Sequence, residues 1–430
     1  MTAAQPRVLV VSTSWGLAIL SFVNLFNYLD RYVVAALFES LKHSALAPSD
    51  GQLGALMSAF LIVYTLAAPA FGALGDRRPR PRLIAFGVGC WSLATALSGF
   101  AGSYVALLAA RATVGIGEAA YGTIAPSLLA DYFPASRRGR VMAIFFCAIP
   151  VGSALGYVIG GLVDVHLGWR AAFWIAGAPG LILAALCCLL PDPPRGAEDS
   201  AEESAPPAPA PASAPAGSAG PSGLVTATLG AYRRLLGNRR YVLTVLGYAA
   251  YTFAVGGLAA WMPSFLERVR GIPKAQAAVS FGMIVVVTGF LGTFAGGWLG
   301  DYCVRHSRQA FLWVCGVSVL LAAPFVWAAL TTAAPGAYLG YMVIAQFLIF
   351  VSTGPINAAI VNMVSPLERA SAVALSVFAI HLLGDVLSPT LIGLLSDGWG
   401  LRQAVQIVPG MVLFSGLLWC LAARVRPAHD

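Results

Sequence analysis

Four charged residues lie within long apolar runs of the sequence. Arg111 and Glu118 belong to the run from about residue 104 to 130, and Asp30 and Arg31 are adjacent in the first apolar run. A charge at the centre of a membrane-spanning helix costs about 2.5–3.5 kcal/mol on insertion scales, so a residue kept there is a candidate for function. A carboxylate near a guanidinium group can exchange protons, and arginine binds phosphate in bidentate geometry. The pattern predicts a site for protons and an anion.

The spacing of these residues indicates which partners they need. Arg111 and Glu118 share one helix face, because seven residues are nearly two turns, but about 10 Å separates them along the axis. Each therefore needs a partner on another helix. Asp30 is the candidate partner of Arg111, and Glu118, which has no partner on its own helix, is the stronger candidate for proton exchange. The alternative is a structural ion-pair network that locks the first span to the fourth, and both roles are compatible.

The composition places most of the chain in lipid. Of its 430 residues, 58% are hydrophobic and 10% are charged, whereas soluble domains usually carry about 25% charge. This balance disfavours a nucleic-acid-binding protein despite the net charge of +8. The seven cysteines have no CxxC or metal-ligand spacing, and no Ser/His/Asp or Cys/His constellation stands out. We therefore expect no enzyme, no metal site and no cofactor.

The apolar runs predict an all-α membrane protein of the major facilitator type, with twelve transmembrane helices in two six-helix bundles. The expected spans are about 14–38, 52–75, 82–101, 104–130, 140–164, 169–190, 241–266, 275–300, 310–331, 337–364, 370–396 and 403–424.

A segment rich in Pro, Ala, Gly and Ser divides the two predicted bundles. Residues 191–236 form a predicted cytoplasmic linker between an N-terminal bundle, 1–190, and a C-terminal bundle, 237–430. Near its end, apolar residues at helical spacing beside arginines predict a short interfacial helix. The loops that carry Arg77 and Arg305 are more basic than the intervening ones. This bias predicts a multi-pass protein of the cell (cytoplasmic) membrane with both termini in the cytoplasm.

Two motifs recur at matching places in the two halves. GALGDRRPR (72–80) follows the second span and GWLGDYCVR (297–305) follows the eighth, while FPASRRGRVMA (133–143) follows the fourth and SPLERASAVAL (365–375) the tenth. Such pairing indicates duplication, as in transporters built from two helical bundles. The charged residues of these loops are predicted to form a conformational latch rather than a substrate site; they are Asp76, Arg77, Arg140 and Asp301.

These motifs resemble the signature loop of the major facilitator superfamily, and within it the chain is similar to bacterial members of the Spinster family of lysolipid and sphingosine-phosphate transporters. The strings that carry this resemblance are NYLDRY (27–32), GEAAYGTIAPSLLADYF (117–133), AIPVGSALGY (148–157), DPPRGA (192–197) and HLLGDVLSPTLIGLLSD (381–397). The resemblance covers nearly the whole membrane portion and excludes the linker.

The resemblance implies roles for the intramembrane charges. Asp30 and Glu118 are the expected proton-coupling residues, and Arg31 and Arg111 the expected ligands of the anionic head. Further residues are predicted to line a substrate cavity; they are Asn27, Tyr28 and Tyr121. His381 and Asp385 lie one turn apart on one face. Either they act in gating or they form a helix–helix hydrogen bond.

The predicted function is therefore proton-coupled secondary transport, by alternating access, of an amphipathic anionic lipid such as a lysophospholipid or sphingoid phosphate. The expected partners are this substrate, protons and membrane lipids, with no nucleic acid, and the protein is expected to be a monomer. One alternative is a proton-coupled symporter of a small organic anion such as a sugar acid. Another is a receptor or scaffold that transports nothing, against which the intramembrane charges argue.

Overall fold

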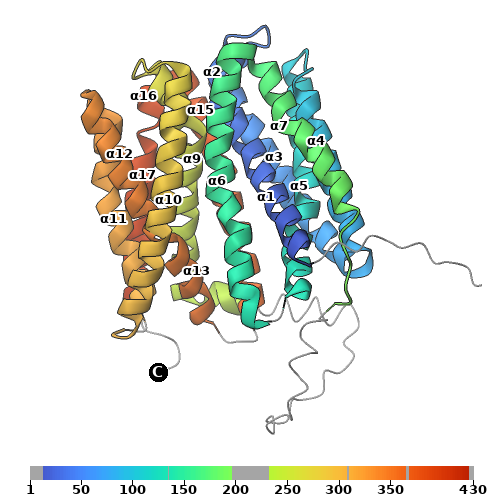
Figure 1. Ribbon diagram of the computed structural model, residues 1–430. Coiled ribbons are helices and arrows are strands. Elements are labelled where there is room, and N and C mark those ends of the chain that lie inside the picture. The colour runs from blue at the N-terminus through green and yellow to red at the C-terminus, as the bar shows by residue number, and fades with distance from the viewer. Residues whose placement is uncertain (1–12, 134, 196–231, 308, 365–367, 426–430) are drawn as a thin grey trace, which may run out of the picture. The chain divides into compact units, whose positions relative to one another are not determined.

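The computed structural model describes residues 13–133, 135–195, 232–307, 309–364 and 368–425. Within these ranges the regular secondary structure is helical and contains no strand, as the composition predicted. Figure 1 shows long helices, and those that follow one another in the chain are joined at their ends by turns and short helices.

The first half of the chain contains long helices at the six predicted spans. They are α1 (Thr13–Ala36), α3 (Asp50–Arg77), α4 (Arg80–Ser98), α5 (Tyr104–Tyr132), α6 (Ala135–Leu167) and α7 (Trp169–Cys187), with a short α2 (Phe38–Lys42) between the first two.

The second half has three continuous long helices followed by interrupted ones. The continuous helices are α9 (Arg239–Arg268), α10 (Lys274–Val304) and α11 (Ala310–Thr331). The expected span 337–364 is split into α12 (Pro335–Val351) and α13 (Thr353–Asn362). The expected span 370–396 consists of α14 (Arg369–Ile380), a π-helical turn η2 (His381–Asp385) and α15 (Leu387–Trp399). The chain ends with α16 (Leu401–Ala404) and α17 (Ile407–Arg424).

Residues 232–237 are also helical, just before α9. They contain the end of the predicted interfacial helix, whose beginning lies outside the described residues. The predicted linker is described only at 191–195 and at 232–236.

Nine helices of the described chain are long and apolar enough to cross a membrane. The remaining long helices are α1, α4 and α5. In α1 and α5 the charged and amide side chains of the candidate site lower the mean hydropathy of the helix. These two helices are therefore less apolar than the nine, because they carry the residues that suggest function. Membrane-spanning backbone must satisfy its hydrogen bonds within the segment, which is why every apolar run is a helix.

The chain divides into two compact units. Unit 1 holds the described parts of Met1–Leu37 and Ala59–Ala210, and unit 2 those of Phe38–Ser58 and Pro211–Asp430. The connection between α1 and α3 thus packs with the second half of the chain, and α3 belongs to both units. Each unit is described separately below.

In unit 1, glycines of α6 bring α1 into backbone contact. A methyl group at Gly152 would strike the carbonyl oxygen of Leu25, and one at Gly156 that of Leu29. Small residues permit such approach in membrane helices, where packing rather than the hydrophobic effect holds helices together. The contact fixes the rotation of α1 and therefore the direction of Asp30.

Glycines of α5 hold that helix between two neighbours. Gly115 lies against the carbonyl oxygen of Phe60 on α3, and Gly117 against the carbonyl oxygen of Gly87 on α4. Glu118 follows directly, so its side chain is placed by a helix that touches both neighbours through its backbone. Gly115 and Gly117 therefore serve close helix packing.

In unit 2, α9 packs on α17 and α17 on α11. Trp419 of α17 donates a hydrogen bond from Nε1 to the carbonyl oxygen of Thr244, at 3.0 Å. The Phe38–Ser58 segment packs on the same unit: Phe38 contacts Trp261 with 5.1 Å between ring centroids, and Gly393 of α15 lies against the backbone of Asp50.

Candidate substrate and proton site

Asp30 and Arg111 form a buried ion pair between α1 and α5. Arg111 NH1 lies 3.1 Å from Asp30 Oδ1, and both side chains are almost entirely shielded from solvent. The second carboxylate oxygen accepts a hydrogen bond from the hydroxyl of Thr95 on α4, at 2.7 Å. The predicted pairing of Asp30 with Arg111 is therefore confirmed, while Thr95 was not identified from the sequence. A lone threonine in an apolar run gives no signal until its neighbour is known.

Arg31 and Glu118 form a second ion pair between the same two helices. Arg31 Nε lies 2.7 Å from Glu118 Oε2; the Glu118 side chain is 0% exposed and the Arg31 side chain 19% exposed. The other carboxylate oxygen, Oε1, is buried and has no hydrogen-bond partner among the described residues. The sequence singled out both residues but did not identify them as partners.

Aromatic rings surround the Arg31 guanidinium group. Its Cζ lies 4.8 Å from the ring centroid of Tyr28, 5.0 Å from that of Phe60 and 5.3 Å from that of Tyr64. Rings at these distances attract a cation through their quadrupoles. Tyr28 was predicted to line a cavity, and the structure places it against Arg31. Because the rings restrain the planar group, they orient whichever donors of Arg31 are not used by Glu118.

The two pairs together carry no net charge. Asp30 and Arg31 are consecutive residues of α1, and they pair with Arg111 and Glu118, which lie nearly two turns apart on one face of α5. Charges buried in a low-dielectric interior are stable only when compensated. The cluster is therefore balanced as it stands, and any anion that joins it must be accompanied by a positive charge.

Asn27 and Tyr121 are buried, and each lies three residues from a member of the charged cluster. The hydrogen bonds of their side chains differ. Asn27 Nδ2 has no hydrogen-bond partner among the residues described. The Tyr121 hydroxyl donates to the carbonyl oxygen of Leu20 at 2.7 Å and so ties α5 to α1. Asn27 retains a free donor for a ligand, whereas Tyr121 already uses its own.

His381 and Asp385 come together within one helix of unit 2. The Nδ1 atom of His381 lies 3.0 Å from Asp385 Oδ1, and both side chains are partly exposed. They are the first and last residues of η2, and π-helical turns are frequent at functional sites. The interaction is made within the helix, not between helices. A gating role stays a prediction.

The predicted latch residues lie at the ends of helices. Arg77, Arg140 and Asp301 are exposed, and the side chain of Asp76 lies outside what the structure describes. Their conformational role therefore stays a prediction.

The start of the DPPRGA string is held by unit 1 through Arg80. Arg80 Nε lies 2.9 Å from Asp192 Oδ1, its NH2 donates to the carbonyl oxygen of Pro193 at 2.7 Å, and its NH1 pairs with Asp131. Arg195 donates to the carbonyl oxygen of Gly75 at 2.7 Å. The segment after α7 is thereby fastened to the loop that follows α3, the signature loop of the sequence.

A cluster of charges at helix ends in unit 2 was missed. Arg268, the last residue of α9, lies 2.5 Å from Asp50 and 2.6 Å from Glu39, and Lys42 lies 2.6 Å from Asp50. Asp397 of α15 accepts hydrogen bonds from the backbone N–H groups of Asp50 and its neighbour at the start of α3. From the sequence these were loop charges beyond the spans, and nothing local indicated that residues more than 200 positions apart would meet.

Comparisons with known proteins agree with this fold. Residues 20–384 match the Major Facilitator Superfamily. The sphingosine-1-phosphate transporter SPNS2 of Mus musculus is 34% identical over 437 residues, which cover 94% of this chain and 76% of that protein. Protein spinster of Drosophila melanogaster is 33% identical, and the match covers 88% of this chain but 61% of that longer protein.

A solved structure has the same fold. It is the crystal structure of a bacterial homologue of the human lysosomal transporter Spinster, in an inward-facing and unoccupied conformation. It matches with a TM-score of 0.82 at 24% identity and covers 98% of both chains. The family match, the curated relatives and the fold agree that this chain belongs to the Spinster family of the major facilitator superfamily, a family of multi-pass membrane transporters.

Proposed function

We propose that this protein is a proton-coupled transporter of an amphipathic lipid anion, a lysophospholipid or sphingoid phosphate, that works by alternating access. The observation that carries the proposal is the buried Arg31–Glu118 pair, in which the cation is partly accessible and the carboxylate has an unsatisfied oxygen. The lipid class is supported by membership of the Spinster family and by the similarity to the mouse sphingosine-1-phosphate transporter SPNS2.

Glu118 is the better supported of the two proton-coupling candidates. Asp30 has both carboxylate oxygens in hydrogen bonds, to Arg111 and Thr95. Glu118 has one oxygen bound to Arg31 and one without a partner. A proton on that second oxygen would convert Glu118 to a neutral acid and remove its hold on Arg31. Asp30 would remain ionised and keep Arg111 in place.

Arg31 is the better supported ligand for the anionic head. Arg111 is fully buried and engaged with Asp30, whereas the Arg31 side chain is 19% exposed and lies among the rings of Tyr28, Phe60 and Tyr64. Guanidinium binds phosphate through paired donors. The rings would contact the first carbons of the lipid chain while Arg31 holds its head.

Charge balance links the two events. An anion on Arg31 would leave the cluster with excess negative charge, and a proton on Glu118 offsets one unit of it. Substrate and proton therefore favour each other's binding, which is the reciprocal coupling that a symport mechanism needs. In the empty, deprotonated site the ion pair re-forms and neutrality is restored.

Proteoliposome transport tests the proposal. Purified protein is reconstituted and offered a lysophospholipid, a sphingoid phosphate or a sugar acid, with and without an imposed pH gradient. We expect gradient-driven accumulation of a lipid anion by the unaltered chain. Glu118→Gln should lose accumulation and keep exchange of substrate across the membrane, because a permanently neutral side chain leaves Arg31 available. Glu267→Gln, the same substitution at the outer end of α9, is the matched control.

Two outcomes would contradict the proposal. Normal gradient-driven accumulation by Glu118→Gln would remove the proton-coupling role. Accumulation of the sugar acid and no lipid anion would favour the organic-anion symporter instead.

We also propose that both termini face the cytoplasm of a cell membrane. The basic residues Arg77, Arg140, Arg305 and Arg424 support this orientation through the positive-inside bias. In a chain freed of its native cysteines, Arg305→Cys should react with a membrane-impermeant maleimide only after lysis, and Arg402→Cys in intact cells. The reverse pattern would invert the orientation.

A further inference from the structure

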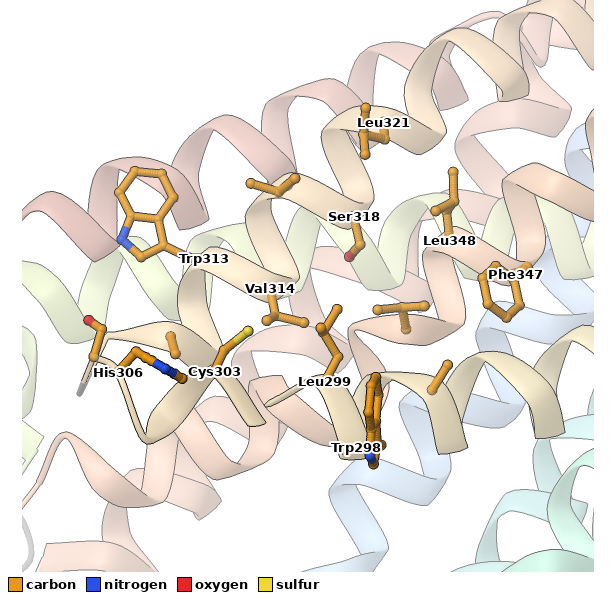
Figure 2. A pocket seen from close by; sticks show the side chains of 15 residues that line it. Trp298, Leu299, Cys303, His306, Trp313, Val314, Ser318, Leu321, Phe347 and Leu348 are labelled. Atoms are coloured by element: carbon orange, nitrogen blue, oxygen red, sulfur yellow. The ribbon is translucent and has the colours of Figure 1, made fainter. Parts of the chain in front are cut away.

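A groove lies on unit 2 between α10, α11 and α12. Its volume is about 630 Å³, within the range of sites that hold a small molecule or cofactor. Its lining is almost entirely apolar, and Figure 2 shows side chains of the three helices pointing into it. Representative lining residues are Leu299, Val314, Val317, Leu321, Phe347 and Leu348.

The groove opens away from the unit's interior. Trp298 is 71% exposed and Val317 is 46% exposed. In a multi-pass membrane protein such exposed apolar side chains face the hydrocarbon of the bilayer. The acyl chains of membrane lipids therefore have access to the groove. On α11 the lining extends from Ala310 to Leu321, eleven residues further along, or about 16 Å of helix. This shape suits an extended acyl chain.

One end of the groove is basic. His306 and Trp313 lie at the same end, opposite Leu321 and Phe347 (Figure 2). Arg305, which precedes His306, is exposed, and the Arg424 guanidinium group lies 5.9 Å from the ring centroid of Trp313. This end of the groove therefore has the His306 imidazole in its lining, Arg424 beside Trp313, and the exposed Arg305 next to His306 in the chain.

Aromatic side chains form one border of the groove. The rings of Trp298 and Tyr302 stack at 5.9 Å, and those of Tyr302 and His306 lie 5.6 Å apart. Trp298 and Tyr302 lie four residues apart on α10, and His306 follows four residues later, just beyond the end of that helix at Val304, so the row runs toward the basic end. Tryptophan and tyrosine gather where hydrocarbon meets head groups, so this border places the basic end at the head-group level and the rest of the groove at chain depth.

We propose that this α10–α12 groove binds one anionic phospholipid of the surrounding membrane, with an acyl chain along α11 and the phosphate held by Arg305 and Arg424. The site is separate from the transport site, because it contains no buried carboxylate that could exchange a proton for the lipid. A second copy of the chain is a poorer occupant, since a symmetric contact through this face would bring the arginines of both copies together.

Native mass spectrometry of the purified protein in detergent tests the assignment. Palmitoyl-oleoyl phosphatidylglycerol and the phosphatidylcholine with the same chains are titrated separately. We expect one phosphatidylglycerol to bind at a clearly lower concentration than phosphatidylcholine. Arg305→Gln and Arg424→Gln should each weaken phosphatidylglycerol binding roughly fivefold and leave phosphatidylcholine unchanged. Val317→Trp, which fills the groove, should abolish binding of both; Leu321→Trp replaces it if that variant fails to fold.

Matched controls separate the groove from the general surface. Val287→Trp is the same change on α10 at a position that is also 46% exposed but outside the groove. Arg402→Gln removes a cation elsewhere. Both should bind phosphatidylglycerol as the unaltered chain does. Equal binding of the two lipids, or retention of phosphatidylglycerol by the groove-filling variant, would overturn the assignment. A dimer that forms in the unaltered chain and is lost in the groove-filling variant would also overturn it. Displacement of phosphatidylglycerol by lower concentrations of its lysolipid would do the same.

Discussion

Units 1 and 2 place their charged residues differently. Unit 1 buries Asp30, Arg31, Arg111 and Glu118 within helices. In unit 2, Arg268 lies at the end of α9 and Asp50 at the start of α3. At a helix end a charge can cap free backbone groups or reach water, whereas in mid-helix it can only meet another side chain. Mid-helix charges therefore require a reason beyond stability, and they are concentrated in unit 1.

The middle of α9 shows what unit 2 has instead. The Tyr251 hydroxyl lies 3.2 Å from the carbonyl oxygen of Ile349 and 3.3 Å from the hydroxyl of Thr353. Asn357 donates to the carbonyl oxygen of Thr353 at 2.9 Å. These groups are neutral and fix the helices without coupling to a proton. The difference agrees with the proposal that proton coupling takes place in unit 1.

The largest expected effect is loss of a buried charge partner in unit 1. Arg111→Leu leaves the Asp30 carboxylate uncompensated and should lower the free energy of unfolding by about 3–5 kcal/mol. Adding Asp30→Asn should recover a large part of this loss. Denaturant-induced unfolding in detergent measures both. An unchanged midpoint for Arg111→Leu would show that the pair is not the support we infer for α1 and α5.

A smaller effect is expected at Thr95, which donates to Asp30. Thr95→Val deletes a hydrogen bond to a charged group and should cost about 1.5–3 kcal/mol. Thr244→Val in unit 2 is the matched control, because its buried hydroxyl returns to the carbonyl oxygen of Arg240 in its own helix, and it should cost about 1 kcal/mol or less. If the two variants lost equal free energy of unfolding, the difference that we infer between the units would be contradicted.

Close packing of α1 gives the third prediction. Gly156→Ala forces a methyl group against the carbonyl oxygen of Leu29 and should destabilise the protein by about 1–3 kcal/mol, as overpacking does. Gly354→Ala on α13 meets no neighbouring atom, and helix propensity makes it neutral or stabilising by up to about 1 kcal/mol. Thermal unfolding of the two variants is compared. A stabilised Gly156→Ala would contradict the contact.

The smallest expected effect concerns His381 and Asp385. The pair is partly exposed and lies within one helix, so His381→Gln should change the free energy of unfolding by about 0–1 kcal/mol. Gradient-driven accumulation in proteoliposomes should persist. Loss of accumulation with retained substrate exchange would place proton coupling in unit 2 as well and would break the comparison between the units.

Local properties of the sequence were sufficient to predict the helices and to identify the four charged residues of the candidate site. An apolar run of membrane length must be a helix because its backbone has no other partner in lipid, and Arg111 or Glu118 inside such a run is visible without any fold. The pairing of Asp30 with Arg111 also followed, because each needed an opposite charge.

Tertiary packing alone decided the rest. Whether Glu118 meets Arg31, and whether Thr95 reaches Asp30, depends on how far each helix is rotated about its axis, and glycine contacts such as that of Gly156 set this rotation. The meeting of Asp50 with Arg268 likewise depends on neighbours remote in the chain. Helix formation in lipid is a property of neighbouring residues, whereas the choice of partner is a property of helix faces.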